Sequence, residues 1–447
     1  MLFGKDPSLQ DKVVDISSRG ALAGEDATAL RLRIHQRLLE VLNLSLLDKT
    51  PRKVLQMEIR DVVTQFLLQE KRVLTQPQFD QLIEDVLDEL LGLGPLEPLL
   101  KDDSVSDILI NTHSTVYVER RGRLEKTNVR FEDSRHLVRI INKIVAAVGR
   151  RVDESQPMVD ARLADGSRVN AIIPPLAVDG PLVSIRKFAK ERIDMGRLVE
   201  LGTITNEMAN ILMAVVKCRR NVLISGGTGS GKTTLLNAMS AFIDHHERIV
   251  TIEDSAELQL QQPHVCRLET RPANIENRGE ITQRDLMRNA LRMRPDRIIV
   301  GEARAGEAFD MLQAMNTGHD GSMTTVHANT PRDALSRLEQ MIGMSGLEIS
   351  SRSVRQQISS AINVVIQLER LEDGRRRVIS VSEITGMEHE IISMQEIYRF
   401  RRRGLDKKGV IVGDFESTGV RPKLMDLIAV RGIDIPITEF TPGRRLT

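Results

Sequence analysis

Apolar residues recur at helical spacing in the first part of the chain. From Leu30 to Leu47, from Val54 to Leu68 and, after Pro77, from Phe79 to Leu91, they fall every three or four residues, which predicts three helices. Such apolar faces are typical of a small helical core, so we expect a helical domain over residues 30–91, preceded by a flexible stretch over 1–29. The Gly and Pro residues of GLGPLEPLL (92–100) end the helical pattern.

Residues 92–188 change to short β-like runs, beginning with DILI and VYVER. A helix is predicted over 134–148, and further strands over 161–163, 168–173 and 183–188. The tetrapeptide ADGS (164–167) between two of these strands is typical of a hairpin turn, which indicates an antiparallel sheet. We therefore expect an α+β domain over 92–188, followed by a linker over 189–204.

In the remaining part, 205–447, helices alternate with short apolar strands. Helices are predicted over 205–217, 232–243 and 282–292, and strands over 222–225, 249–252 and 298–300. This alternation predicts a parallel, doubly wound α/β sheet. Past residue 390 lie a Gly-rich tail and a basic cluster, which we expect to be solvated, with docking of an acidic partner or of lipid head groups as the alternative. The cluster consists of Arg399, Arg401, Arg402 and Arg403.

The composition excludes several classes of protein. The chain has 447 residues, 41% hydrophobic and 28% charged, which excludes a disordered or collagen-like chain. A net charge of +1 and 3% aromatic residues argue against stable nucleic-acid binding. The N-terminus lacks the apolar core of a signal peptide, and the longest charge-free run, 356–368, is shorter than the ~18 apolar residues of a spanning helix. We expect a cytoplasmic protein with reduced thiols at Cys218 and Cys266 and only peripheral membrane contact.

The strongest motif is GGTGSGKT, from Gly226 to Thr233, which matches the P-loop pattern between a strand and a helix. Its glycines let backbone N–H groups point at phosphate, and the helix N-terminus adds partial positive charge. We expect Lys232 to reach the β- and γ-phosphates of ATP and the Thr233 hydroxyl to ligate Mg²⁺. The expected nucleotide-binding residues are Gly227, Thr228, Gly229, Ser230, Gly231, Lys232, Thr233 and Thr234.

Acidic residues follow two of the predicted strands. Glu253 and Asp254 follow the strand over 249–252, and Glu302 follows the strand over 298–300. Because ligands bind beyond the carboxyl ends of parallel strands, we expect Glu253 and Glu302 to face the nucleotide and to hold water or Mg²⁺. For Asp254 and Glu257, capping of the next helix is as good an interpretation as a role at the nucleotide.

Two histidines, His319 and His327, lie within the polar stretch TGHDGSMTTVHAN (317–329). Without a Cys, His or Asp ligand set around them, a zinc site is disfavoured. The residues alone leave open whether this loop senses phosphate or is only structural.

Taken in order, four stretches resemble the Walker A, Asp box, Walker B and His box of the type II and type IV secretion and pilus traffic ATPases. They are GGTGSGKT, TIEDSAEL (251–258), RMRPDRIIVGEAR (292–304) and TGHDGSMTTVHAN. Four stretches upstream of the P-loop are most similar to the CpaF-type ATPases of Tad (tight adherence) pilus assembly. They are GLGPLEPLL, SDILIN, DARLADGSRVNAIIPP and SIRKF. The resemblance covers about residues 85–430 and implies a RecA-like ATPase core behind a PAS-like α+β domain.

The resemblance also implies roles for single residues. Glu253 would be the general base, and Glu302 would position Mg²⁺ and water. His319 and His327 would lie near the γ-phosphate and a subunit boundary. One departure is Val300, which stands where the Walker B strand usually has Asp, so that Glu302 would carry the metal-side role. A second departure is the lack of a four-cysteine metal insert.

Family arginines that reach the nucleotide match Arg168 and Arg186 and, less closely, Arg162; from spacing alone these would be surface ion-pair partners. The resemblance implies a homo-hexamer that hydrolyses ATP with Mg²⁺ and works on membrane platform proteins at the cytoplasmic face of the inner membrane. This would be the motor of Tad-type type IV pilus assembly, with retraction as an open question. Three alternatives remain: a type IV secretion ATPase exporting protein or DNA, a nucleotide-gated scaffold without turnover, and a nucleic-acid motor.

Overall fold

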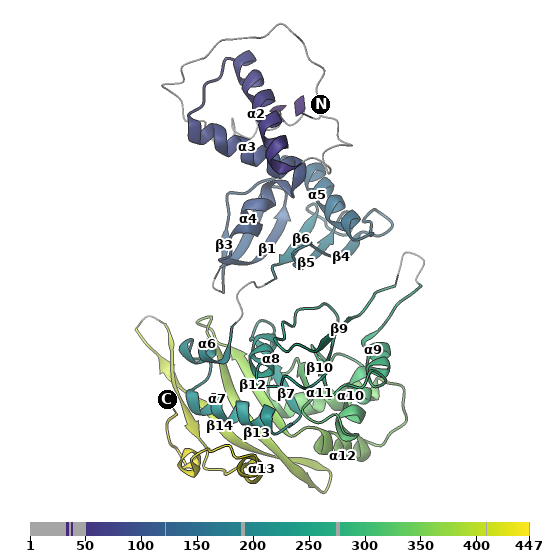
Figure 1. The fold of residues 1–447 in the computed structure, drawn as a ribbon, viewed down its shortest axis with the longest axis vertical. Coiled ribbons are helices and arrows are strands. Elements are labelled where there is room, and N and C mark those ends of the chain that lie inside the picture. The colour runs from purple at the N-terminus through teal and green to yellow at the C-terminus, as the bar shows by residue number, and fades with distance from the viewer. Residues whose placement is uncertain are drawn as a thin grey trace. The chain divides into compact units, whose positions relative to one another are not determined.

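The chain forms two compact units, Met1–Lys190 and Glu191–Thr447, in a computed structural model (Figure 1). The structure describes residues 33–34, 37–38, 51–120, 122–188, 193–273, 278–407 and 409–446. The flexible stretch predicted over 1–29 and almost all of the helix predicted over 30–47 lie outside these residues. No helix within the described ranges combines the length and hydrophobicity needed to cross a bilayer.

The first unit begins with two helices, α2 (Arg52–Gln69) and α3 (Gln76–Leu91), which confirm the helical periodicity of this region. The backbone N–H of Thr75 donates to the Gln78 side chain at 3.0 Å, and a proline in the first turn helps α3 to begin there. The two helices share a small apolar core, which includes Leu55, Ile59, Val63, Ile83 and Leu87. Two short helices, η2 (Gly94–Leu96) and α4 (Glu97–Lys101), follow.

The rest of this unit is a six-stranded sheet whose strands all pair antiparallel, as predicted. Its order is β3-β2-β1-β6-β5-β4. Helix α5 (Ser134–Ala147) packs its apolar side on the sheet and leaves the opposite face uncovered by this helix. The strands are β1 (Val105–Thr112), β2 (Thr115–Arg120), β3 (Arg123–Lys126), β4 (Met158–Arg162), β5 (Arg168–Ile172) and β6 (Leu182–Arg186).

The second unit is built on a nine-stranded sheet with the order β15-β14-β13-β12-β7-β11-β10-β8-β9. The strands from β12 to β9 in this order pair parallel, which confirms the predicted parallel sheet. The parallel strands are β7 (Val222–Gly226), β8 (Ile249–Glu253), β9 (Val265–Glu269), β10 (Arg297–Val300), β11 (Met323–Val326) and β12 (Val364–Arg370).

Helices cover both faces of this sheet. On one face α7 (Asn206–Lys217), α8 (Lys232–Ser240) and α13 (Leu424–Val430) enclose one apolar core. On the other face α9 (Gln283–Ala290), α10 (Glu307–Asn316), α11 (Pro331–Gly343) and α12 (Ser351–Ala361) enclose a second core. Strand β7 serves both, because Val222 and Ile224 face the first core and Leu223 faces the second. A short helix, η3 (Ile437–Phe440), lies near the C-terminus.

Two features of this unit differ from the pattern we expected. The segment 189–204 contains α6 (Met195–Glu200), which begins because the Asp194 side chain accepts the Arg197 N–H. The basic tail belongs to an antiparallel extension of the sheet, β13 (Arg376–Glu388), β14 (Ile391–Leu405) and β15 (Ile411–Ser417). There the basic cluster is ion-paired, with Arg399 2.7 Å from Glu416 and Arg402 2.9 Å from Glu372.

Candidate nucleotide-binding site

The parallel strands bring the predicted site together at their carboxyl edge. Strand β7 leads into the P-loop, and β8 ends at Glu253. Glu302 comes two residues after β10, and His327 directly follows β11. The register holds these ends level, because Val326 pairs with Ser225 and Ile252 pairs with Val300. The arrangement explains how four distant stretches of sequence form one site.

The P-loop requires glycine at its first and last glycine positions. A Cβ on Gly226 would lie 2.6 Å from the Leu368 carbonyl oxygen and 2.5 Å from Ser230 Oγ, so no side chain fits there. Gly231, at the N-terminus of α8, has a φ of 96°, which other residues rarely adopt. This loop therefore has the open, N–H-rich backbone that cradles phosphate.

Lys232 is largely buried beside this cradle, with 8% of its surface exposed. Its Nζ donates to the carbonyl oxygens of Gly226 at 2.9 Å and of Gly227 at 3.0 Å, and lies 3.2 Å from His327 Nε2. Burial lowers the pKa of Lys232, an effect that Glu302 opposes and Arg304 adds to. Phosphate oxygens can replace the loop carbonyls as acceptors for the Lys232 ammonium. Their negative charge would offset the cost of burying that ammonium.

Glu302 is held at both carboxylate oxygens. Its Oε1 lies 2.8 Å from His327 Nε2, and its Oε2 accepts a hydrogen bond from Arg304 Nη2 at 2.7 Å. Arg304 also lies 2.8 Å from Asp254 Oδ2, so it joins the acids that follow β8 and β10. The sequence analysis did not identify Arg304 as a site residue. Its position two residues after Glu302, beyond the same strand end, would have indicated that it lies near the site. Asp254 is thus an ion-pair partner here.

Glu253 is fixed at one oxygen only. It is 3% exposed, and its Oε2 accepts the backbone N–H groups of Glu257 at 2.7 Å and Leu258 at 2.8 Å. Its Oε1 is buried with no hydrogen-bond partner among the described residues. Burial raises the pKa of Glu253, although the two N–H groups oppose this. A carboxylate held in this way has one oxygen available to accept a proton from water.

Gly301 makes room for Glu253. A Cβ at Gly301 would lie 3.0 Å from Glu253 Cγ. The glycine between β10 and Glu302 therefore leaves space for the Glu253 side chain, which comes from the adjacent strand β8. This gives a physical reason for glycine before Glu302.

A single nitrogen of His327 faces both a donor and an acceptor. Its Nε2 lies within hydrogen-bonding distance of Lys232 Nζ and of Glu302 Oε1. The ammonium can only donate and an ionised carboxylate can only accept, so Nε2 satisfies one of them at a time. Burial lowers the pKa of His327, Lys232 lowers it further, and Glu302 opposes both. Neutral imidazole at neutral pH is consistent with these effects.

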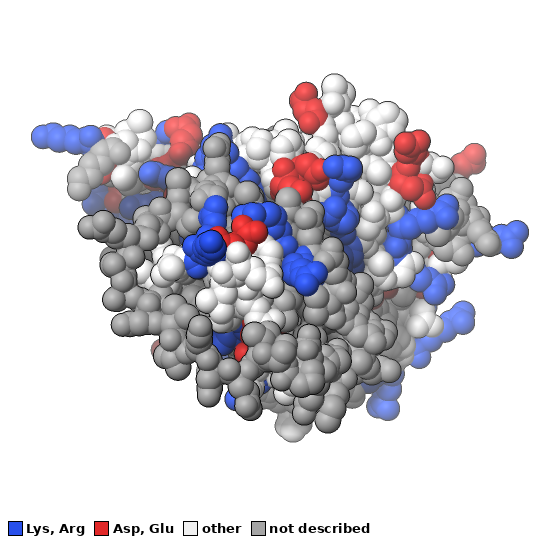
Figure 2. Space-filling view, turned by 90° about the horizontal axis from the view of Figure 1, so that it is seen from above, with Lys and Arg blue, Asp and Glu red and all other residues white. Residues whose placement is uncertain are grey.

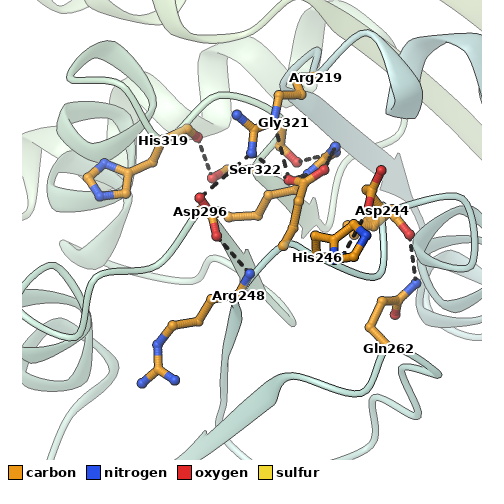
Figure 3. Close-up of polar contacts among 12 residues, drawn as sticks. Arg219, Asp244, His246, Arg248, Gln262, Asp296, His319, Gly321 and Ser322 are labelled. Carbon is orange, nitrogen blue, oxygen red and sulfur yellow. Dashed lines mark hydrogen bonds and ion pairs between the residues drawn. The ribbon is translucent and has the colours of Figure 1, made fainter.

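The structure does not bring His319 to the P-loop. His319 precedes β11 and His327 follows it, so the two lie at opposite edges of the sheet. His319 Nδ1 lies 3.2 Å from the Ala314 carbonyl oxygen, and its own carbonyl accepts a hydrogen bond from the Ser322 hydroxyl at 2.7 Å. Figure 3 shows His319 with Arg219, Asp296 and Ser322 at the amino edge of the sheet, the edge at which the parallel strands begin.

The predicted arginines lie in the first unit, in one row across its sheet. Arg168 pairs in register with Arg186 on one side and with Arg162 on the other, which places the three on the same face. Arg186 Nε lies 3.2 Å from Asp107 Oδ1.

Comparisons with known proteins point to one family. The family model described as "Type II/IV secretion system protein" matches residues 89–405. The chain is 39% identical over 309 residues to a "Putative conjugal transfer protein" of Mycobacterium tuberculosis, covering 68% of this chain and 87% of the relative. It is 33% identical to the "Conjugal transfer protein TrbB" of Rhizobium radiobacter, covering 68% and 89%. A crystal structure of the VirB11 ATPase from the Brucella suis type IV secretion system, in complex with sulphate, has 27% identity, covers 65% of this chain and 95% of that chain, and has a TM-score of 0.35.

Proposed function

We propose that this chain, an ATPase that belongs to the type II/IV secretion system protein family, is the hexameric motor of Tad-type pilus assembly. The motor chemistry rests on one observation: Lys232, Glu253, Glu302 and His327 meet at the carboxyl edge of one parallel sheet, beside a P-loop. Four polar groups converging there would bind a nucleoside triphosphate, and membership of an ATPase family supports ATP.

ATP and Mg²⁺ fit the residues present. The glycine cradle and Lys232 would hold the phosphates, with Gly227, Thr228, Gly229, Ser230, Gly231 and Thr234 as the other contacts. No cluster of three or more His, Cys, Asp or Glu in the described ranges is placed to hold a metal. Mg²⁺ would therefore arrive with the nucleotide and be held by its phosphates, the Thr233 hydroxyl and, partly through water, Glu302. Glu253 would act as the general base on the attacking water.

Arginines of the first unit would complete the site. The row that contains Arg168, Arg186 and Arg162 presents three guanidinium groups on one sheet face. We propose that Arg168 and Arg186 approach the triphosphate when the two units close, because a planar guanidinium stabilises charge on transferring phosphoryl oxygens. Opening and closing would then convert ATP hydrolysis into movement of membrane platform proteins at the cytoplasmic face of the inner membrane.

The client distinguishes the proposal from its closest alternative. The sequence upstream of the P-loop resembles that of the Tad branch of the family, which supports pilus assembly. The conjugal transfer proteins of Mycobacterium tuberculosis and Rhizobium radiobacter, to which the chain is similar, favour a second candidate, an ATPase of type IV secretion that exports protein or DNA. Both candidates use the same site chemistry. Figure 2 shows both basic and acidic side chains among the described residues of the face it presents.

Steady-state hydrolysis of Mg²⁺-ATP tests the site. We expect Lys232→Ala and Glu302→Gln to lower the turnover number by about a hundredfold or more, because each loses a charge that acts on the transferring phosphate. The exposed residues Lys217 and Glu348, changed to Ala and Gln, are the matched controls and should keep wild-type turnover. Wild-type turnover in both site variants would contradict the assigned site, and absent turnover in the wild type would favour the scaffold alternative.

Deleting the gene in its own host tests the client. Loss of surface pili with unchanged DNA transfer would support the Tad motor. Loss of DNA or protein export with pili intact would select the second candidate.

A further inference from the structure

The antiparallel extension of the sheet reaches the P-loop through one side chain. Strand β12 runs beside β7, with Leu368 in register with Gly226. The chain then turns back from β12 into β13, which begins at Arg376. Arg376 Nε donates to the carbonyl oxygen of Gly229 in the P-loop at 2.9 Å. A residue 147 positions later in the sequence thus holds the phosphate-binding loop from outside.

This contact constrains the orientation of a P-loop peptide. Gly229 has a φ of 69°, and its carbonyl points to Arg376. Because a peptide bond is planar and trans, holding the carbonyl also fixes the direction of the following N–H, that of Ser230. Arg376 therefore acts on the shape of the cradle without occupying it.

The turn that carries Arg376 is itself braced. The Asp373 side chain accepts the backbone N–H groups of Arg375 at 3.0 Å and of Ile411 at 2.9 Å. Glu372 lies 2.9 Å from Arg402 of β14. The guanidinium is thus mounted on a turn that is fixed to two further strands of the sheet.

The next residue, Arg377, contacts a different part of the unit. Its Nη1 donates to the Gly202 carbonyl oxygen at 2.9 Å, and the N–H of Val378 donates to the Thr203 carbonyl oxygen at 2.9 Å. The Arg377 guanidinium lies 4.7 Å from the ring centre of Phe400 and 5.6 Å from that of Phe415. Gly202 and Thr203 follow α6 and belong to the segment through which the chain enters the ATPase unit.

We propose that Arg376 and Arg377 are positioning residues that couple the P-loop to the entry segment, residues 195–204. Successive side chains of a strand point to opposite sides, so the start of β13 contacts the P-loop on one side and the entry segment on the other. When phosphate rearranges the Gly229 peptide, the start of β13 transmits the change to the segment that leads from the first unit. The inference rests on nucleotide binding at the P-loop, as proposed above.

Binding of Mg²⁺-ADP to the full chain, followed by calorimetry and by hydrogen exchange of residues 195–204, tests the coupling. In the wild type, we expect saturating Mg²⁺-ADP to change exchange in this segment. Arg376→Gln should bind ADP about tenfold more weakly, as expected for the loss of one charge-assisted hydrogen bond, and should lose the exchange response even at saturation. Arg377→Gln should bind ADP within about twofold of the wild type and also lose the response.

Three further variants make the test specific. Arg375→Gln is the matched control, because Arg375 is exposed on the same turn and should leave affinity and exchange response unchanged. Arg376→Lys should restore part of the affinity, because an ammonium can donate to the Gly229 carbonyl. Arg377→Lys keeps the positive charge and replaces Arg377→Gln if the latter does not fold.

The outcomes separate this inference from the proposed function. A wild type that does not bind Mg²⁺-ADP would overturn the proposed function together with the inference. A wild type that binds, with exchange responses in folded Arg376 and Arg377 variants equal to its own, would overturn the inference alone.

Discussion

At the amino ends of the parallel strands, buried charges are paired with one another, whereas at the carboxyl ends of the same strands their bonding partners are incomplete or exchangeable. Arg297, at the start of β10, is 1% exposed and binds the Glu247 carboxylate with two hydrogen bonds of 2.6 and 2.8 Å. Arg219 binds Glu247 at 2.8 Å. Although burial raises the pKa of Glu247, the two arginines outweigh it and lower that pKa below its usual value.

Backbone groups at the amino edge are satisfied in the same way. The Asn221 side chain accepts the N–H groups of Gly321 at 2.8 Å and of Ser322 at 2.9 Å and donates to the Ala361 carbonyl at 2.7 Å. A Cβ at Gly321 would lie 2.6 Å from Arg297 Nη1, so glycine is needed there for packing. Gly321, the second glycine of the TGHDG stretch, therefore serves the fold.

The carboxyl edge differs in what its groups lack. Glu253 keeps one buried oxygen without a partner among the described residues, and Lys232 is held by carbonyl oxygens that phosphate can replace. Similar residue types thus stabilise the fold at one edge and remain available for a ligand at the other. A buried charge therefore points to function when its bonding partners are incomplete or exchangeable.

The largest effect should come from disrupting the paired edge. Glu247→Ala removes the carboxylate that neutralises the buried Arg297. We expect the free energy of unfolding to fall by about 3–5 kcal/mol, because an uncompensated charge is left buried. Chemical denaturation measures the loss, and the control Glu348→Gln at an exposed position should stay within about 0.5 kcal/mol of the wild type. An equally small loss in Glu247→Ala would show that the amino edge is not the structural edge.

The two histidines test the contrast between the edges directly, since they lie at opposite ends of β11. We expect His327→Ala to lower the turnover number for ATP about a hundredfold, because it removes the group between Lys232 and Glu302. His319→Ala should leave turnover within about twofold in protein that remains folded. Steady-state kinetics at saturating Mg²⁺-ATP decides, and equal losses in both variants would contradict the division between the edges.

The smallest effect should be a pH dependence of stability at Glu253. Its folded-state pKa is raised, so the contribution of Glu253 to stability is fully present below the unfolded pKa and is lost as pH rises through the folded pKa. Relative to Glu253→Gln, the nucleotide-free wild type should therefore gain stability as pH falls from neutral towards the ordinary pKa of a glutamate. His327 titrates in both proteins and cancels in the difference. Thermal melts across this range measure it, and a constant difference would show that burial does not disfavour the ionised form of Glu253.

Much of the fold and site could be predicted because the signals are local. The P-loop of Gly226–Thr233 is recognisable from eight neighbouring residues, and apolar runs alternating with helical periods place Glu253 and Glu302 after strands. The antiparallel strands after residue 370 were missed. Register shifts interrupt the apolar alternation of β13 and β14, and the basic residues of β14 lower its hydrophobicity further, so no clear strand pattern is left in the sequence.

Local sequence was enough to specify the phosphate cradle, most of the strands and helices over residues 205–300, and the family, because each depends on residues close together in the chain. The folded arrangement was needed to establish that His327 faces Lys232 while His319 does not, that Arg304 joins Asp254 to Glu302, and that Arg376 contacts the P-loop. These contacts depend on strand direction and register between segments up to 147 residues apart, which spacing along the chain does not encode.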